Sequence, residues 1–176
     1  MFDIKNSCDF LEKFYEDYDD FQNNRQSARL AINAALTAYH LAEWVWGDWL
    51  KKDHVTWAKL NIRDEETFIK WLDEACFYFP VMQRIANGSK HFIRKDQATT
   101  LKSGGYGQGG YGVGGYGEAS LQIEVASRFD ETDKTWLDAQ ILIEDVLIFW
   151  RNFFKDHSPY KSDMPRHGIL LYDFKD

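Results

Sequence analysis

The strongest constraint on the fold of this chain is a long stretch of helical periodicity between about residues 23 and 51. Apolar side chains recur there at steps of three and four residues, and the stretch contains no proline: Leu30, Ala34, Leu41, Val45 and Trp49. This spacing places the apolar side chains on one face of an α-helix. The sequence therefore predicts a long central helix whose apolar face the other elements must cover.

Three shorter segments with the same periodicity surround this helix. We expect helices over residues 8–18, 80–95 and 138–155, each with apolar residues on one face. Asp64 is a typical helix N-cap, since Glu65, Glu66 and Thr67 follow it in the first turn and an apolar face runs on to Ala75. We expect a connection near residues 53–63. Pro80 ends the helix that Asp64 opens or begins the next one.

The segment before the last helix has a different composition. Residues 104–117 contain three copies of Gly-Gly-Tyr-Gly and nine of the twelve glycines, so we predict a flexible insertion over residues 103–119. Its tyrosines could alternatively stack bases in a flexible arm. Leu121, Ile123 and Val125 alternate with polar residues, which predicts a strand and a small hairpin with residues 135–137. Residues 158–176 are expected to form a surface tail.

The 176 residues fit one domain, and a composition of 44% hydrophobic and 16% aromatic residues is enough for a core. We therefore predict a single domain over residues 1–176: a mainly α fold, a four- to five-helix bundle with a small β-hairpin and a glycine-rich loop before the last helix. No apolar run is long enough to cross a membrane, and no signal-peptide pattern begins the sequence. We expect a cytoplasmic protein in which Cys8 and Cys76 are reduced thiols.

A basic segment stands out because the whole chain carries a formal charge of −7, which argues against non-specific binding of nucleic acid over the whole surface. Arg84 and His91 fall within roughly 20° of each other around a helix, with Asn87 beside them. Three further basic residues follow without an intervening acid: Lys90, Arg94 and Lys95. A phosphate would be attracted to this face. The alternative is that these are solvated polar residues opposite an apolar face.

The run Arg84-Ile-Ala-Asn-Gly-Ser-Lys-His91 resembles the motif of the HEPN superfamily, in which an Arg precedes a His by a gap of four to six residues. The resemblance covers roughly residues 20–155, including Tyr39-His40-Leu41-Ala42-Glu43-Trp44 on the long helix. It implies a helical bundle, a homodimer with a shared cleft, and a metal-independent endoribonuclease in a toxin or defence setting, with an antitoxin or another partner protein. Arg84 and His91 would be catalytic.

The residue types suit that chemistry. His titrates near neutral pH and can move protons at the 2′-hydroxyl, while Arg offers a forked donor to phosphate oxygens. Asn87 and Lys90 would support the pair, Arg94 and Lys95 would bind RNA, and no cofactor or metal is required. A catalytically inactive module that binds RNA, a nucleotide or a protein partner is the alternative, and a purely structural domain is a third interpretation.

Two further features of these helices bear on the site. Asn33, Thr37, His40 and Trp44 follow one another at helical steps, with Glu43 three beyond His40. His40 and Glu43 could orient the active groups, hold a metal with His91, or be an interior histidine and its neighbour. Gly88 in mid-helix often marks the close approach of another backbone or of a ligand.

Overall fold

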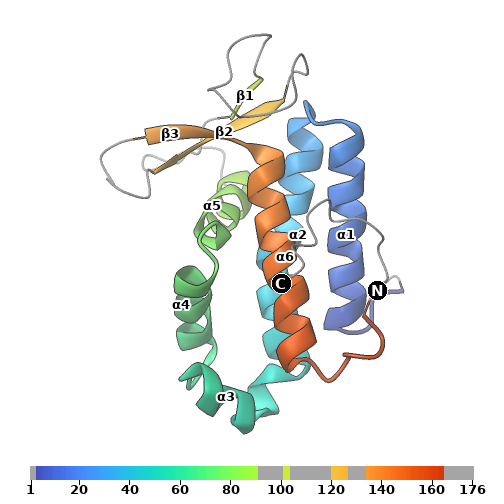
Figure 1. Cartoon of the computed structure of the whole chain (residues 1–176), viewed down its shortest axis with the longest axis vertical. Helices are drawn as coiled ribbons and strands as arrows, with labels where there is room; N and C mark the ends of the chain where they lie inside the picture. Colours follow the sequence, from blue (N-terminus) through green and yellow to red (C-terminus); the bar gives the residue numbers. More distant parts are fainter. Residues whose placement is uncertain (1–2, 91–100, 104–119, 127–133, 165–176) are drawn as a thin grey trace, which may run out of the picture.

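Helix α2 (Ala28–Asp48) is the central element of the computed structural model. The structure describes residues 3–90, 101–103, 120–126 and 134–164. Helices α1 (Ser7–Asn23) and α5 (Phe79–Lys90) both pack against α2, and α6 (Ala139–His157) packs against α1 and α2. In Figure 1, α2 and α6 lie between α1 on one side and α5 on the other.

Three short helices connect the end of α2 to α5. They are the 3₁₀ turn η1 (Leu50–Lys52), α3 (His54–Leu60) and α4 (Glu65–Ala75). In Figure 1, α3 lies at the lower end of the molecule and α4 leads from it towards α5. The prediction of a mainly helical protein with a small sheet is confirmed.

The core combines small residues on α2 with large aromatic rings on the helices around it. Ala34, Ala38 and Ala42 are fully buried on α2, and their small side chains leave room for rings from neighbouring helices. Trp150 of α6 is also fully buried, and its indole Nε1 donates a hydrogen bond of 3.2 Å to the carbonyl oxygen of Ala38. The Trp150 ring meets that of Phe79, at the start of α5, edge to face at 6.3 Å. One side chain therefore joins α2, α5 and α6.

The strands β1 (Leu101–Ser103), β2 (Leu121–Ala126) and β3 (Lys134–Asp138) form an antiparallel sheet with β2 in the middle. The predicted strand over residues 121–125 and its pairing with residues 135–137 are confirmed. The pairing of β1 with β2 was not predicted, because β1 has only three residues and lies across the glycine-rich tract from its partner. Leu121 N donates to the carbonyl oxygen of Arg25 (3.0 Å), which joins the sheet to the connection between α1 and α2.

The start of the long helix and the end of the first helix were predicted wrongly, and one short helix was not predicted. The long helix begins at Ala28 and not near residue 23, because Ser27 is its N-cap and Asn23 belongs to α1. The expected connection near residues 53–63 contains α3, which was not predicted from the sequence. Asp53 caps this helix by accepting from the backbone N–H groups of Val55 (3.2 Å) and Thr56 (3.1 Å), and a left-handed residue at Asn61 (φ 55°) ends it.

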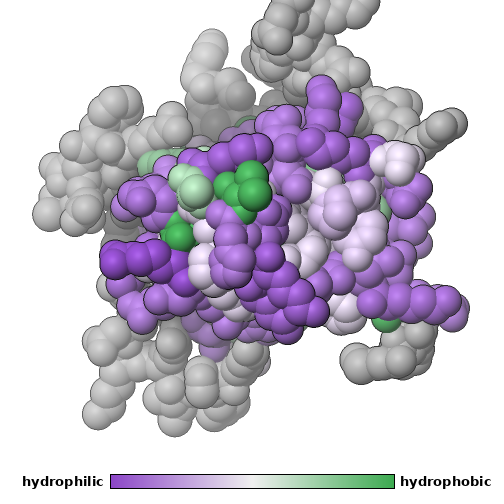
Figure 2. Space-filling view, turned by 90° about the horizontal axis from the view of Figure 1, so that it is seen from below, coloured by the Kyte–Doolittle hydropathy of each residue, from purple (hydrophilic) through white to green (hydrophobic). Residues whose placement is uncertain are grey.

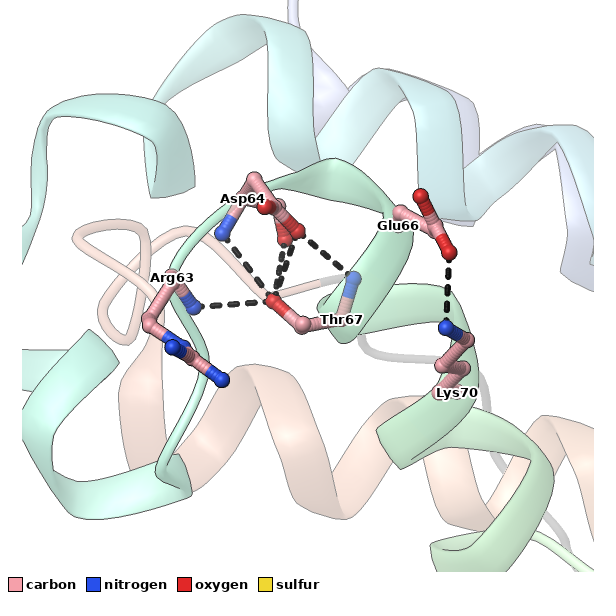
Figure 3. Close-up of polar contacts among 5 residues, drawn as sticks. All are labelled: Arg63, Asp64, Glu66, Thr67 and Lys70. Carbon is pink, nitrogen blue, oxygen red and sulfur yellow. Dashed lines mark hydrogen bonds and ion pairs between the residues drawn. The ribbon is translucent and has the colours of Figure 1, made fainter.

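The predicted N-cap of α4 is confirmed, and Figure 3 shows its contacts. Asp64 Oδ1 accepts from the backbone N–H of Thr67 (2.8 Å), while Thr67 Oγ1 accepts from the backbone N–H groups of Arg63 (2.8 Å) and Asp64 (3.0 Å). These contacts satisfy N–H groups that the first turn of a helix leaves without partners. One turn later Lys70 pairs with Glu66 at 2.6 Å on the exposed face.

Figure 2 views the molecule from the α3 end, where hydrophilic residues cover most of the surface and apolar residues form only small spots. Val55 of α3 is 67% exposed.

None of the described helices is long and apolar enough to cross a membrane. The glycine-rich insertion, apart from Ser103 at the end of β1, and residues 165–176 of the predicted tail lie outside the described residues.

Candidate functional site

Helix α5 begins at a tight turn that fixes the direction of its polar face. Phe79 N donates to the carbonyl oxygen of Cys76 (2.9 Å), and the carbonyl oxygen of Tyr78 accepts from Val81 N (3.0 Å) and Met82 N (3.3 Å). Pro80 lies in the first turn, where its missing N–H removes no helical hydrogen bond. Of the two predicted roles of Pro80, the structure therefore selects the start of a helix.

The two sides of α5 differ as the periodicity predicts. Phe79, Met82 and Ala86 are fully buried on the side that meets the core. Arg84 and Asn87 are half-buried on the other side, three residues apart, and Gly88 and Ser89 beyond them are exposed. Arg84 and Asn87 therefore lie on the same side of α5, next to Gly88. We call these three residues the polar face of α5.

Arg84 is the most unusual side chain on this face. Its Nε is buried and has no hydrogen-bond partner, and no carboxylate within the described part of the chain forms an ion pair with its guanidinium. This is unexpected in a chain with 28 acidic and 21 basic side chains. A buried donor left without a partner costs about 1–3 kcal/mol, and more when it is charged.

Gly88 follows Arg84 by one helical turn and has open space around it. A Cβ built on Gly88 meets no heavy atom within 4 Å. Within the described part of the chain, no backbone makes the close approach to Gly88 that was expected there, and the approach of a ligand stays a prediction. Ser89 does not add a free hydroxyl at this end, because its Oγ donates to the carbonyl oxygen of Ala86 at 2.7 Å.

The basic residues that continue the face are not all described. Lys90 is the last described residue of α5, and His91, Arg94 and Lys95 lie outside the described residues. The spacing of Arg84 and His91 and the roles of Lys90, Arg94 and Lys95 stay predictions. What the structure adds is the environment of Arg84 and Asn87.

His40 and Glu43 of α2 contact each other, with 3.0 Å between His40 Nδ1 and Glu43 Oε2. The His40 ring lies 5.3 Å from the ring of Tyr39, which in turn lies 5.9 Å from that of Phe79. Tyr39 thus connects His40 to the beginning of α5. The support that His40 and Glu43 would give to Arg84 and His91 stays a prediction.

Two other residues of the predicted stripe on α2, Thr37 and Trp44, face α1. Thr37 is buried, and its hydroxyl forms hydrogen bonds with Lys13 Nζ (2.8 Å) and Asp17, while Trp44 stacks on Phe10 at 4.8 Å. Tyr39, which reaches α5, is about 200° around the helix from Thr37. Thr37 and Trp44 therefore hold α1 to α2.

Sequence reasoning missed a polar cluster where the segment after α6 meets the beginning of α1 and the end of α2. Asp48 Oδ2, at the end of α2, accepts from Ser7 N (2.9 Å), Ser7 Oγ (2.8 Å) and Tyr160 Oη (2.9 Å). Cys8 Sγ donates to the carbonyl oxygen of Asp163 (3.5 Å) beside it. These contacts fasten the segment after α6 to α1 and α2, and no short-range pattern in the sequence signals them.

Neither cysteine is suited to act as a nucleophile. Both are free and buried. Burial, together with nearby acids led by Asp9, raises the pKa of Cys8 to about 11, and burial raises the pKa of Cys76 to about 12. Both thiols are protonated at neutral pH, and the thiolate is the reactive form.

Two further buried polar atoms without hydrogen-bond partners lie around the ring of Phe153. They are Trp49 Nε1 and His157 Nδ1, and the two rings lie 6.1 Å and 5.0 Å from that of Phe153. Burial lowers the pKa of His157, so the neutral imidazole is the favoured form there. Among the described residues, no three His, Cys, Asp or Glu side chains gather as metal ligands would.

Comparison of this chain with protein-family models, with curated proteins and with solved structures finds no match.

Proposed function

We propose that this chain binds RNA through the polar face of α5 and cleaves it without a metal, with Arg84 on the phosphate and His91 moving the proton. The observation that supports this most is the half-buried Arg84, which forms no ion pair with a carboxylate of the described residues. A phosphate oxygen is the acceptor that a forked guanidinium binds best. Asn87, three residues on, would offer its amide to the same group.

The proposed reaction is an internal transfer at phosphorus. The 2′-oxygen attacks the adjacent phosphorus, the bond from phosphorus to the 5′-oxygen breaks, and the products are a 2′,3′-cyclic phosphate and a 5′-hydroxyl. His91 takes the proton from the 2′-hydroxyl and supplies one to the departing 5′-oxygen. Arg84 stabilises the negative charge that grows on the non-bridging oxygens.

The biological setting is also part of this proposal. The likeness of the Arg84 to His91 run to the HEPN motif suggests a HEPN-like bundle that works as a homodimer, in a toxin or defence role opposed by an antitoxin. The basic residues Lys90, Arg94 and Lys95 would extend the contact along the RNA backbone.

The test uses the full-length chain with a labelled single-stranded RNA. Cleavage in excess EDTA and a 2′,3′-cyclic phosphate end are the expected results. His91→Ala is expected to slow cleavage by roughly 10²- to 10⁴-fold with little change in affinity. Arg84→Lys keeps the charge but loses the fork, so it should bind RNA nearly normally and cleave it poorly.

The contrary outcomes separate the alternatives. Cleavage that EDTA abolishes and one divalent metal restores would shift the site to His40, Glu43 and His91. RNA binding without any cleavage would identify an inactive RNA-binding module. Equal cleavage by wild type and His91→Ala would remove His91 from the reaction, provided that the variants keep the wild-type circular dichroism.

A further inference from the structure

Gly88 has no structural reason to be glycine within the described part of this chain. Its backbone is helical and not left-handed, so an L side chain is allowed there, and an added Cβ meets nothing within 4 Å. Glycine weakens a helix relative to alanine because it has more freedom to lose on folding. The fold therefore gives up stability at Gly88 and gains no packing contact there from the described residues.

The open space at Gly88 lies beside Arg84. Four residues along an α-helix correspond to a rise of about 6 Å and a turn of about 40°, so Gly88 lies next to Arg84 on the same side of α5. Without a side chain, the helix backbone at Gly88 can be approached more closely than at any residue with a Cβ. A phosphate held by Arg84 would bring its neighbouring sugar to this spot.

We infer that Gly88 is the point at which the RNA backbone crosses α5 in van der Waals contact with the helix. This inference rests on the proposed function and deepens it, because it assigns a second contact to the same site. Arg84 holds the phosphate by charge, whereas Gly88 admits the adjacent ribose by its lack of a side chain. A side chain at Gly88 would lift the ribose away from α5 and move the phosphate off Arg84.

The chain contains a matched control. Gly47 is also helical and exposed, near the end of α2, and an added Cβ there likewise meets nothing within 4 Å. A Gly47→Ala substitution therefore changes helix preference as Gly88→Ala does, but on a different helix from Arg84. If Gly88→Ala changes the affinity for RNA and Gly47→Ala does not, the change is attributed to the polar face of α5.

The experiment measures the melting temperature and the affinity for a fluorescein-labelled single-stranded RNA of about 20 nucleotides, in the full-length chain. Both alanine variants are expected to raise the melting temperature, by up to about 2–4 °C. Gly88→Ala is expected to weaken RNA binding at least fivefold and Gly88→Leu further still. Gly47→Ala is expected to bind RNA within twofold of wild type.

Each other outcome has a definite meaning. If Gly88→Ala melts higher and binds RNA like wild type while Arg84→Ala binds weakly, the inference is wrong and the proposed function stands. If Gly88→Ala lowers the melting temperature, or if both glycine variants weaken binding equally, the inference is also wrong. If wild type binds no RNA, or Arg84→Ala binds it as tightly as wild type, the proposed function fails and the inference with it.

Discussion

Replacing Trp150 with Phe tests whether one side chain holds α2, α5 and α6 together. The substitution keeps an aromatic ring against Phe79 but removes the indole N–H that donates to the carbonyl oxygen of Ala38. The lost hydrogen bond is worth about 1 kcal/mol, and the smaller ring at a fully buried position costs about 1–2 kcal/mol more. We therefore expect the free energy of unfolding to fall by about 2–3 kcal/mol, which lowers the melting temperature by about 4–12 °C.

The measurement is urea and thermal unfolding followed by circular dichroism, with Ile141→Ala as the control on the same helix. Ile141 is 41% exposed, so its truncation should cost about 1 kcal/mol or less. A Trp150→Phe variant that unfolds at the same urea concentration as wild type, or no earlier than Ile141→Ala, would refute the role given to Trp150.

Two more predictions concern His157 and the glycine-rich tract. Burial lowers the pKa of His157 below its usual 6.5, so the folded chain binds a proton at His157 less tightly than the unfolded chain does. The contribution of His157 to stability is therefore complete above about pH 6.5. It is lost as the pH falls through and below that value. His157→Gln should flatten the fall in melting temperature between pH 7 and 5; identical profiles for wild type and His157→Gln would contradict the prediction. Deleting residues 104–117 should leave the melting temperature nearly unchanged, because a tract of this composition can bury little surface, whereas a loss of many degrees would show that the tract is packed.

The long helices could be predicted because their apolar faces repeat over several turns. Periodicity was enough for α1, α2, α4 and α6, and the Asp64 cap fixed the start of α4 to the residue. Helix α3 has only seven residues, too few for a clear period. Its end signals were present in the sequence, however, since Asp53 is a good N-cap and Asn61 readily adopts the left-handed conformation that ends a helix.

The candidate site was predictable only as a face of one helix. Spacing along α5 places Arg84 and Asn87 together without any knowledge of the fold. The burial of Arg84 Nε and the open space at Gly88 depend on what packs around α5, which spacing cannot supply. The cluster at Asp48 joins residues 41 and 112 positions apart in the sequence, so it follows from the tertiary fold alone.

The most direct test of the central claim, that Arg84 is an anion-binding side chain, compares the RNA affinity of Arg84→Ala with that of Arg63→Ala at several salt concentrations. Arg63 is an exposed arginine before α4, so the Arg63→Ala substitution removes the same charge from another part of the surface. We predict that Arg84→Ala weakens binding about tenfold or more and lowers the salt dependence by the equivalent of about one phosphate contact. Arg63→Ala should stay within twofold of wild type. Equal affinities and equal salt slopes for the two variants would contradict the account.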